Sequence, residues 1–392
     1  MKIVDITEFY SERGGGIRSH LTDRARFLSK HDHRHVVIAP GPRDEVAAVA
    51  AESRSGRGQS TLVRFAGPTQ PYDKTYYFLQ SFRKIRRRVR AESPDVLEAH
   101  SPYLATAAVL AAGRTAARLK TAFWHSDHIG VYLEPMVARH VGPIWASSMA
   151  RGLMRGVRGL LAPFDATFAA GRRQAERLRA AGVRRVIHIP FGVDKQTFRP
   201  SARRDEWRAK IGADGDTAIL VGAGRFAAEK HWEVVLEAFR RVRTHRKAVL
   251  VLFGDGPERR ELERQAPPGV NFVGFERDRT RLATGFASAD ILVHGAPYET
   301  FGLSIAEAVA CGVPIVVPDG GGAAEHTAPA CSEIYRSLDP IACAAAIESL
   351  LARRPEALRA RALEVAEQVP PMENHFRQVL AAYDELLREL GR

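Results

Sequence analysis

The sequence has little cysteine and no long apolar run. Its three cysteines, Cys311, Cys331 and Cys343, are odd in number and include no C-x-x-C pair, which argues against a disulfide framework and a zinc site. No stretch reaches the roughly 18 apolar residues that a membrane-spanning helix needs, and no signal-peptide core follows residues 1–7. We therefore expect a cytoplasmic chain, soluble or peripheral on the inner face of the cell membrane.

Low-complexity sequence is also missing. Hydrophobic residues make up 45% and charged residues 26% of the 392 residues, which is enough to build packed cores. That length exceeds one typical core, so we expect two domains of about 150 to 200 residues each.

Acidic residues are too few to balance the basic ones, and the formal net charge is +13. Such an excess favours an anionic partner, which could be nucleic acid, the phosphates of a small substrate or an anionic membrane surface. An Arg-heavy, Ala-rich composition also reflects a GC-rich genome, so the charge alone does not choose among these.

Predicted strands and helices alternate along the whole chain, which is typical of doubly wound α/β domains with parallel sheets. The Pro- and Gly-bracketed segment 191–200 interrupts the alternation and marks a boundary. We place the domains at 1–194 and 195–371, followed by a last helix within 372–392. The predicted strands are 1–7, 35–40, 61–65, 94–100, 120–123, 166–170, 186–190, 218–224, 248–253, 270–273 and 291–293.

Residues 297–327 (PYETFGLSIAEAVACGVPIVVPDGGGAAEHT) hold the most informative pattern. Glu299 precedes a short predicted helix and Glu307 lies inside it, while Gly302 and Ser304 suit a helix N-terminus that binds a phosphate. A nucleotide sugar offers the matching groups, because its diphosphate accepts from N–H groups and its hydroxyls donate to carboxylates. An ordinary turn with a solvent-facing Glu307 is the alternative.

Other polar residues follow predicted strands, at the end where open parallel sheets bind ligands. Residues 14–16 form a glycine turn after the first strand, without the full G-x-G-x-x-G spacing. Arg225 and Lys230 follow strand 218–224 and would give a diphosphate two cationic contacts. His125 follows strand 120–123 within the sequence WHSDH, where a histidine bonded to loop backbone is the alternative.

One predicted helix is a candidate for contact with a membrane surface. Residues 75–92 predict a basic amphipathic helix, and six of the nine residues 82–90 are Lys or Arg. Either its apolar stripe packs on the sheet and its cations face water, or the helix docks on anionic lipid through Arg83, Lys84, Arg86, Arg87, Arg88 and Arg90. Residues 104–118 and 136–158 are also predicted to be helical.

Two patterns suggest metal binding, and we assign neither of them to a metal site. The histidines in 31–35 come between a helix end and a strand, as a solvated turn does. Asp214 and Asp216 match a D-x-D pattern found in metal-dependent enzymes, but they precede strand 218–224, far in sequence from the residues expected to bind the diphosphate.

Taken together, the chain resembles glycosyltransferase family 4, whose members are retaining enzymes of the GT-B fold. The residues that carry the resemblance are Gly15 and Gly16, the sequence FGVD at 191–194, Gly224, Arg225, Glu229, Lys230, Gly254, Asp255, Gly256, Glu299, Gly302, Glu307, Gly321, Gly322 and Glu325. The resemblance spans nearly the whole chain. It implies two Rossmann-like doubly wound domains facing across a cleft, with the donor held mainly by the C-terminal domain, the acceptor by the N-terminal one, and the last helix crossing back onto the N-terminal domain.

The resemblance also implies roles for single residues. Arg225 and Lys230 would neutralise the diphosphate, Glu299 would bind the hydroxyls of the transferred sugar and Glu307 those of the ribose. Gly16 and His125 would close over the sugar, and His125, Arg225, Lys230 and Glu299 form the implied catalytic set. The implied donor-binding residues are Gly15, Gly16, Gly224, Gly254, Gly256, Phe301, Gly302, Leu303, Ser304 and Glu307.

The reaction expected on this basis moves a hexose from a UDP- or GDP-linked sugar to a hydroxyl acceptor, which could be a glycan or lipid-linked, without metal or other cofactor. Phe226 and His231 depart from the family pattern and leave the donor sugar open. An epimerase or phosphorylase of the same architecture is the first alternative. A basic nucleic-acid-binding protein is the second, although no recognised module supports it and we expect no nucleic acid partner.

Overall fold

The strands form two separate sheets, and the chain divides into two units. Unit 1 comprises Met1–Pro190 and His375–Arg392, and unit 2 comprises Phe191–Asn374. The computed structural model describes residues 1–391 except 12–14, 51–57, 72, 126 and 128. The division falls at the start of the segment 191–200.

Unit 1 contains an eight-stranded sheet in the order β3-β4-β2-β1-β5-β6-β7-β8, in which β3 alone runs antiparallel to its neighbour. Its strands are β1 Lys2–Ile6, β2 Arg34–Gly41, β3 Glu45–Ala50, β4 Gln59–Ala66, β5 Val96–Ala99, β6 Leu119–Trp124, β7 Ala166–Ala169 and β8 Val186–His188. Its helices are α1 Gly16–Lys30, α2 Phe82–Glu92, α3 Leu104–Ala112, α4 Glu134–Val141, α5 Pro143–Leu161, α6 Arg172–Ala180 and, at the end of the chain, α14 Met372–Glu389.

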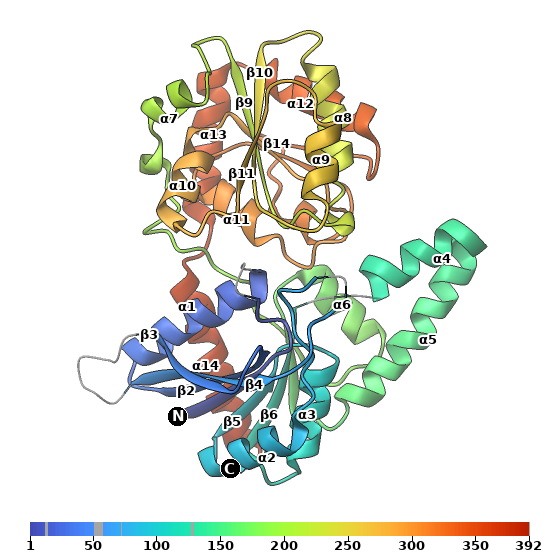
Figure 1. Cartoon of the computed structure of the whole chain (residues 1–392), viewed down its shortest axis with the longest axis vertical. Helices are drawn as coiled ribbons and strands as arrows, with labels where there is room; N and C mark the ends of the chain where they lie inside the picture. Colours follow the sequence, from blue (N-terminus) through green and yellow to red (C-terminus); the bar gives the residue numbers. More distant parts are fainter. Residues whose placement is uncertain (12–14, 51–57, 72, 126, 128, 392) are drawn as a thin grey trace. The chain divides into compact units, whose positions relative to one another are not determined.

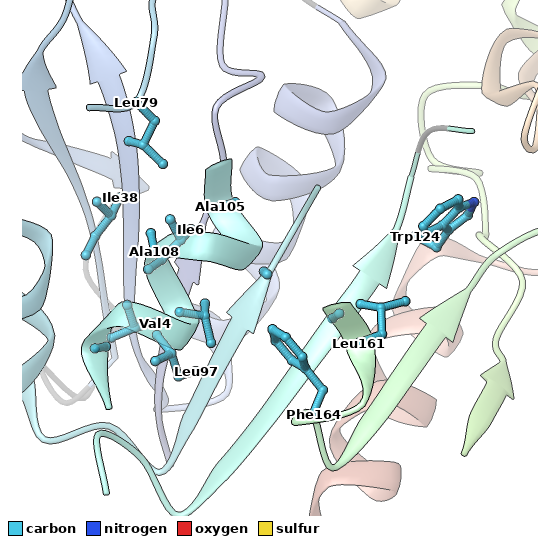
Figure 2. Close-up of a cluster of buried hydrophobic side chains, with 14 of the residues drawn as sticks. Val4, Ile6, Ile38, Leu79, Leu97, Ala105, Ala108, Trp124, Leu161 and Phe164 are labelled. Atoms are coloured by element: carbon cyan, nitrogen blue, oxygen red, sulfur yellow. The ribbon is translucent and has the colours of Figure 1, made fainter. Parts of the chain in front are cut away.

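The sheet of unit 1 is buried on both faces, as parallel sheets with helical crossovers are. Along β2, Ile38 belongs to a cluster with side chains of α2 and α3, whereas Val37 belongs to a cluster with α1. Figure 2 shows the first cluster, in which Ile6 and Leu97 meet the small side chains of α3. Successive residues of a strand point to opposite faces, and both faces are buried here. These strands are therefore continuous apolar runs in the sequence.

Unit 2 contains a six-stranded parallel sheet in the order β11-β10-β9-β12-β13-β14. Its strands are β9 Ala218–Ala223, β10 Ala248–Phe253, β11 Val270–Gly274, β12 Ile291–Val293, β13 Ile315–Pro318 and β14 Ser332–Tyr335. Its helices are α7 Asp205–Lys210, α8 Trp232–Val242, α9 Arg259–Gln265, α10 Arg279–Ser288, α11 Leu303–Ala310, α12 Pro340–Leu351 and α13 Pro355–Gln368.

The last helix, α14, leaves unit 2 and packs on unit 1 (Figure 1). Phe376 and Tyr383 are buried there. The Tyr383 hydroxyl donates to Glu98 at the end of β5 at 2.8 Å and accepts from Arg24 of α1 at 2.8 Å. Residues far apart in sequence thus share one buried polar network.

Three predicted helices are shorter than expected. The segment predicted at 136–158 is two helices, because Gly142 has a left-handed φ of 106° that ends α4, and Pro143 begins α5. Gly113, with φ of 104°, ends α3 before residue 118. Residues 75–81 are not helical, because Tyr77 pairs with Thr69 in a β-bridge. None of the helices in the described part of the chain has the length and apolarity needed to cross a bilayer.

Candidate functional site

The strand order of unit 2 reverses direction at β9, with β10 on one side and β12 on the other, and such switch points are where open α/β sheets bind ligands. Lys230 follows β9 in a short 3-10 turn, Ala228–Lys230, and Glu299 follows β12. Their side chains form an ion pair, with Lys230 Nζ donating to Glu299 Oε1. Two residues predicted from separate motifs therefore meet at the carboxyl ends of these strands.

The Glu299 carboxylate is held in its charged form. Burial by itself raises its pKa, but the Lys230 ammonium and the neighbouring His294 outweigh burial and lower it. His294 Nε2 lies 3.3 Å from Glu299 Oε1. His294 directly follows β12, so its position at the ligand edge was available in the sequence, but we did not select it there.

Arg225 leaves the end of β9 and pairs with Glu229, whose Oε1 accepts from Arg225 at 2.7 Å. Burial raises and Arg225 lowers the pKa of Glu229, and the net direction is down. The Trp232 indole donates to the Arg225 carbonyl at 2.9 Å, which fixes the loop between β9 and α8. The Arg225 side chain is about one-third exposed and accessible to a ligand.

Helix α11 begins beside the end of β9. Gly302, its N-cap, has φ of 86°, a left-handed conformation that glycine adopts without a steric penalty. Ser304 donates to the Ala223 carbonyl at 3.3 Å, which ties the first turn of α11 to β9. The positive end of this helix, with the backbone at Phe301 and Leu303, therefore lies at the same edge as Arg225 and Lys230.

Glycines let the surrounding loops approach one another closely. The Gly322 N–H donates to the Glu299 carbonyl at 2.6 Å, and a Cβ on Gly321 would come within 2.8 Å of the same oxygen. A Cβ on Gly254 or Gly256 would overlap the backbone of Gly224 or Phe226. Close packing of the loops that carry Arg225 and Glu299 thus accounts for these glycines.

Glu307 is buried, with 3% of its side chain exposed, and pairs with Arg279 of α10 at 2.8 Å. The Arg279 guanidinium also lies 4.7 Å above the Phe198 ring. No motif in the sequence indicated this partner. The Glu307 side chain is therefore buried and paired with a cation, and the alternative of a solvent-facing Glu307 is wrong.

Comparison with known proteins decides the family. The profile of Glycosyltransferase Family 4 matches residues 14–197, and that of Glycosyl transferases group 1 matches residues 203–368. A GDP-mannose-dependent alpha-mannosyltransferase of Mycobacterium tuberculosis CDC 1551 is 31% identical, over 82% of this chain and 80% of its own. The chain belongs to glycosyltransferase family 4.

Further similarities agree with this assignment. A GDP-mannose-dependent alpha-(1-6)-phosphatidylinositol dimannoside mannosyltransferase of M. tuberculosis H37Ra is 29% identical over 81% of this chain and 79% of its own. Sucrose-phosphate synthase from Thermosynechococcus elongatus has the same fold, with a TM-score of 0.77 over 99% of both chains and 18% identity. The expected GT-B fold is confirmed, and this glycosyltransferase transfers a hexose from a nucleotide sugar.

Unit 1 of the glycosyltransferase presents His125 directly after β6. His125 is 9% exposed and stacks on Phe123, with ring centroids 4.3 Å apart. Its Nε2 lies 2.8 Å from His100 Nδ1. Burial first, and the adjacent His100 second, lower the pKa of His125 well below its usual value, so the ring is neutral.

His100, which sequence analysis did not select, connects His125 to two carboxylates. Its Nε2 lies 3.3 Å from Asp5 Oδ1 and 3.3 Å from Glu98 Oε1. In the contact between His100 Nδ1 and His125 Nε2 one ring donates and the other accepts, so the tautomers of the two rings are linked. The polar end of strand 94–100 was the signal in the sequence that could have identified His100.

The same carboxylates hold a buried arginine. Arg24 of α1 pairs with Asp5 at 3.1 Å and with Glu98 at 2.6 Å, and all three side chains are at most 2% exposed. His35 lies 2.8 Å from the second oxygen of Asp5. Burial raises the pKa of Asp5, but Arg24 and the two histidines outweigh it and lower that pKa well below its usual range.

Among the described residues of unit 1, two groups bring possible metal ligands together. One is His20, His100 and His125, and the other is Asp5, Glu98 and His100. In a tetrahedral zinc site, ligand nitrogens about 2.0 to 2.1 Å from the metal lie roughly 3.3 Å apart. The 2.8 Å contact of His100 with His125 is a hydrogen bond, and Arg24 already balances the carboxylates. Neither donor set fits a metal well.

Asp214 and Asp216 precede the amino end of β9, opposite the ligand edge.

The remaining predicted residues of unit 1 differ in their surroundings. Gly15 has φ of 124°, which favours glycine, whereas a Cβ on Gly16 would meet nothing within 4 Å. Gly14 and, in WHSDH, Ser126 and His128 lie outside the described residues.

The basic helix α2 uses its apolar stripe in the core. Ile85 and Val89 are fully buried, and Phe82 packs against the same cluster. Arg88 pairs with Glu92 at 2.7 Å and Lys84 with Asp44 at 2.6 Å. No apolar stripe of α2 remains for a bilayer, because the sheet covers it. Only an electrostatic contact through the exposed cations Arg83, Arg86, Arg87 and Arg90 remains possible.

Proposed function

We propose that this enzyme transfers mannose from GDP-mannose to a hydroxyl group of a lipid-linked acceptor, with retention of the α-anomer and without a metal ion. The ion pair of Lys230 with Glu299 carries this proposal. In a nucleotide sugar the β-phosphate is bonded to the anomeric carbon, so a cation for the phosphate and a carboxylate for the sugar hydroxyls must be neighbours. The names of the mannosyltransferases similar to this chain supply the base and the sugar.

The chemistry requires stabilisation of a leaving group. Cleavage of the anomeric C–O bond places charge on the diphosphate, and Arg225, Lys230 and the N-terminus of α11 would receive that charge. These donors make a divalent ion unnecessary. The departing phosphate would accept the proton of the acceptor hydroxyl as that hydroxyl attacks the same face of the sugar.

The carboxylates take separate roles in this proposal. Glu307, oriented by Arg279, would accept from the ribose hydroxyls. Glu299 would accept from hydroxyls of mannose, where geometry changes as the sugar flattens toward an oxocarbenium ion. Gly16 and His125 keep the sugar-binding roles that the family resemblance implies for them.

Two measurements test the donor and the metal. Thermal shift should rank GDP-mannose and GDP above UDP-glucose, because a ligand at 100 times its Kd stabilises a fold by about 2.7 kcal/mol. Transfer of labelled mannose from GDP-mannose to a polyprenyl or phosphatidylinositol-based acceptor, followed by anomer analysis by NMR, should give the α-product with EDTA present. Loss of activity in EDTA with recovery in Mn²⁺ would contradict the metal-free mechanism.

A further inference from the structure

Helix α5 presents three different faces along its length. Ala146, Ala150, Met154 and Leu161 are buried, and the last three belong to the core cluster of unit 1. These positions recur at helical spacing, so a single face of α5 holds the helix on the domain. The other two faces are not used by this packing.

The second face is apolar and exposed. Trp145 is 67% exposed and Leu153 is 39% exposed, two turns apart on the same side of α5. Ile144, at 81%, adjoins Trp145, and Val141 at the end of α4 is 60% exposed. Figure 1 shows α4 and α5 as a helical hairpin that projects from the rest of unit 1. The turn where α4 meets α5 therefore carries three large apolar side chains in water, Val141, Ile144 and Trp145.

The third face is cationic. Arg151, Arg155 and Arg158 recur at spacings of four and three residues and are exposed, as is Arg139 on α4. Residues 135–164 contain neither Asp nor Glu. No other described residue forms an ion pair with any of these four arginines, so their charge is uncompensated within the unit.

We propose that the α4–α5 hairpin docks the enzyme on an anionic lipid bilayer, a surface that extends the proposed function toward its lipid-linked acceptor. Trp145 and Ile144 enter the interface between headgroups and acyl chains, while the arginines bind lipid phosphates. A second copy of the chain fits this surface less well, because a two-fold contact would bring the arginine faces of two hairpins together.

The test is co-sedimentation of the full chain with vesicles of phosphatidylcholine, with or without phosphatidylglycerol, at low salt and without any donor or acceptor. Wild type should pellet with the anionic vesicles only. The double variant Ile144→Ser, Trp145→Ser should partition at least about tenfold less, because it removes the inserted apolar surface. Both residues are exposed, so circular dichroism and the thermal midpoint should match those of wild type.

A charge-matched pair of variants separates docking from general attraction. Changing Arg151, Arg155 and Arg158 to Glu should abolish pelleting, whereas changing the exposed Arg86, Arg87 and Arg90 of α2 to Glu should reduce it much less. Equal losses from the two triple variants, wild type remaining in the supernatant, or normal pelleting of the Ile144/Trp145 variant would each overturn the proposal. So would sedimentation velocity showing a dimer that the Ile144/Trp145 variant dissociates.

Failure of docking and failure of the proposed function remain distinguishable. Vesicle binding needs no nucleotide sugar, and the thermal shift by GDP-mannose needs no vesicle. If a docking variant keeps its thermal shift with GDP-mannose but no longer pellets, the docking surface is confirmed independently of the donor. If wild type pellets but shows no thermal shift with GDP-mannose, the proposed donor is wrong and the docking surface stands.

Discussion

The two units handle buried charge in opposite ways. In unit 1, Arg24, Asp5 and Glu98 form a network at most 2% exposed, closed by Tyr383. In unit 2, Lys230 and Glu299 are 21% and 16% exposed at the carboxyl edge of the sheet. A closed network holds elements of the fold together, whereas a partly open pair retains charge that a ligand can use. Mutations should therefore affect stability in unit 1 and turnover in unit 2.

The largest expected effect is on stability. Replacing Arg24 by Met should lower the free energy of unfolding by about 3 to 5 kcal/mol, because it leaves Asp5 and Glu98 buried without their cation. Arg26, two residues along α1, pairs with Asp23 at the surface, so Arg26→Met is the control and should change nothing measurable. Urea denaturation measures both. Equal effects would mean that the network of unit 1 is not what stabilises it.

Next in size is an effect on rate. Lys230→Met should lower kcat by about 10² to 10³, because one donor to the developing diphosphate charge is lost, while stability changes little. Lys247→Met is the control, since Lys247 pairs with Asp214 at the surface. Steady-state kinetics with GDP-mannose give the comparison. A large loss of stability with normal kcat would mean that Lys230, like Arg24, stabilises the fold and does not take part in catalysis.

A smaller effect distinguishes the two carboxylates. Glu299→Gln should mainly lower kcat, whereas Glu307→Gln should mainly raise KM for the donor, each by roughly tenfold or more. Arg279→Met should reproduce the KM effect of Glu307→Gln, because Arg279 orients that carboxylate. Small and equal changes from the two glutamate variants would return both to structural roles.

The smallest effect per residue concerns pH. Burial lowers the pKa of His20, His125 and His375 in unit 1, to about 3 for His375. A lowered folded-state pKa means that the unfolded chain binds more protons below about pH 6.5, so stability is fully present above that value and falls as the pH decreases toward 3. At pH 5.5 each such histidine should cost about 1.4 kcal/mol.

Unit 2 should lose less on the same change, because His326 is its one histidine with a pKa resolved as lowered among the described residues. Hydrogen exchange with mass spectrometry at pH 7.5 and 5.5, corrected for intrinsic exchange rates, reads the units separately. Greater acid sensitivity in peptides of unit 2 than in those of unit 1 would contradict the expected difference between the units.

The alternation of strands and helices could be read from the sequence, because apolar periodicity and glycine turns are local properties. The same holds for residues that directly follow strands: parallel strands bring their carboxyl ends to one edge, and Lys230 and Glu299 meet there. Helix lengths were less predictable, since a single glycine with positive φ, such as Gly142, divides a periodic segment without interrupting its apolar pattern.

Tertiary structure alone decided the partners of charged groups and the fate of apolar faces. Arg279 of α10 contacts Glu307 of α11. Arg24 of α1 contacts Asp5 of β1, Glu98 of β5 and Tyr383 of α14, so this network joins four elements. The stripe of α2 is covered by the sheet, whereas Trp145 of α5 is not. Each outcome depends on which surfaces remain after the layers pack, and the spacing of residues along one helix carries no information about that.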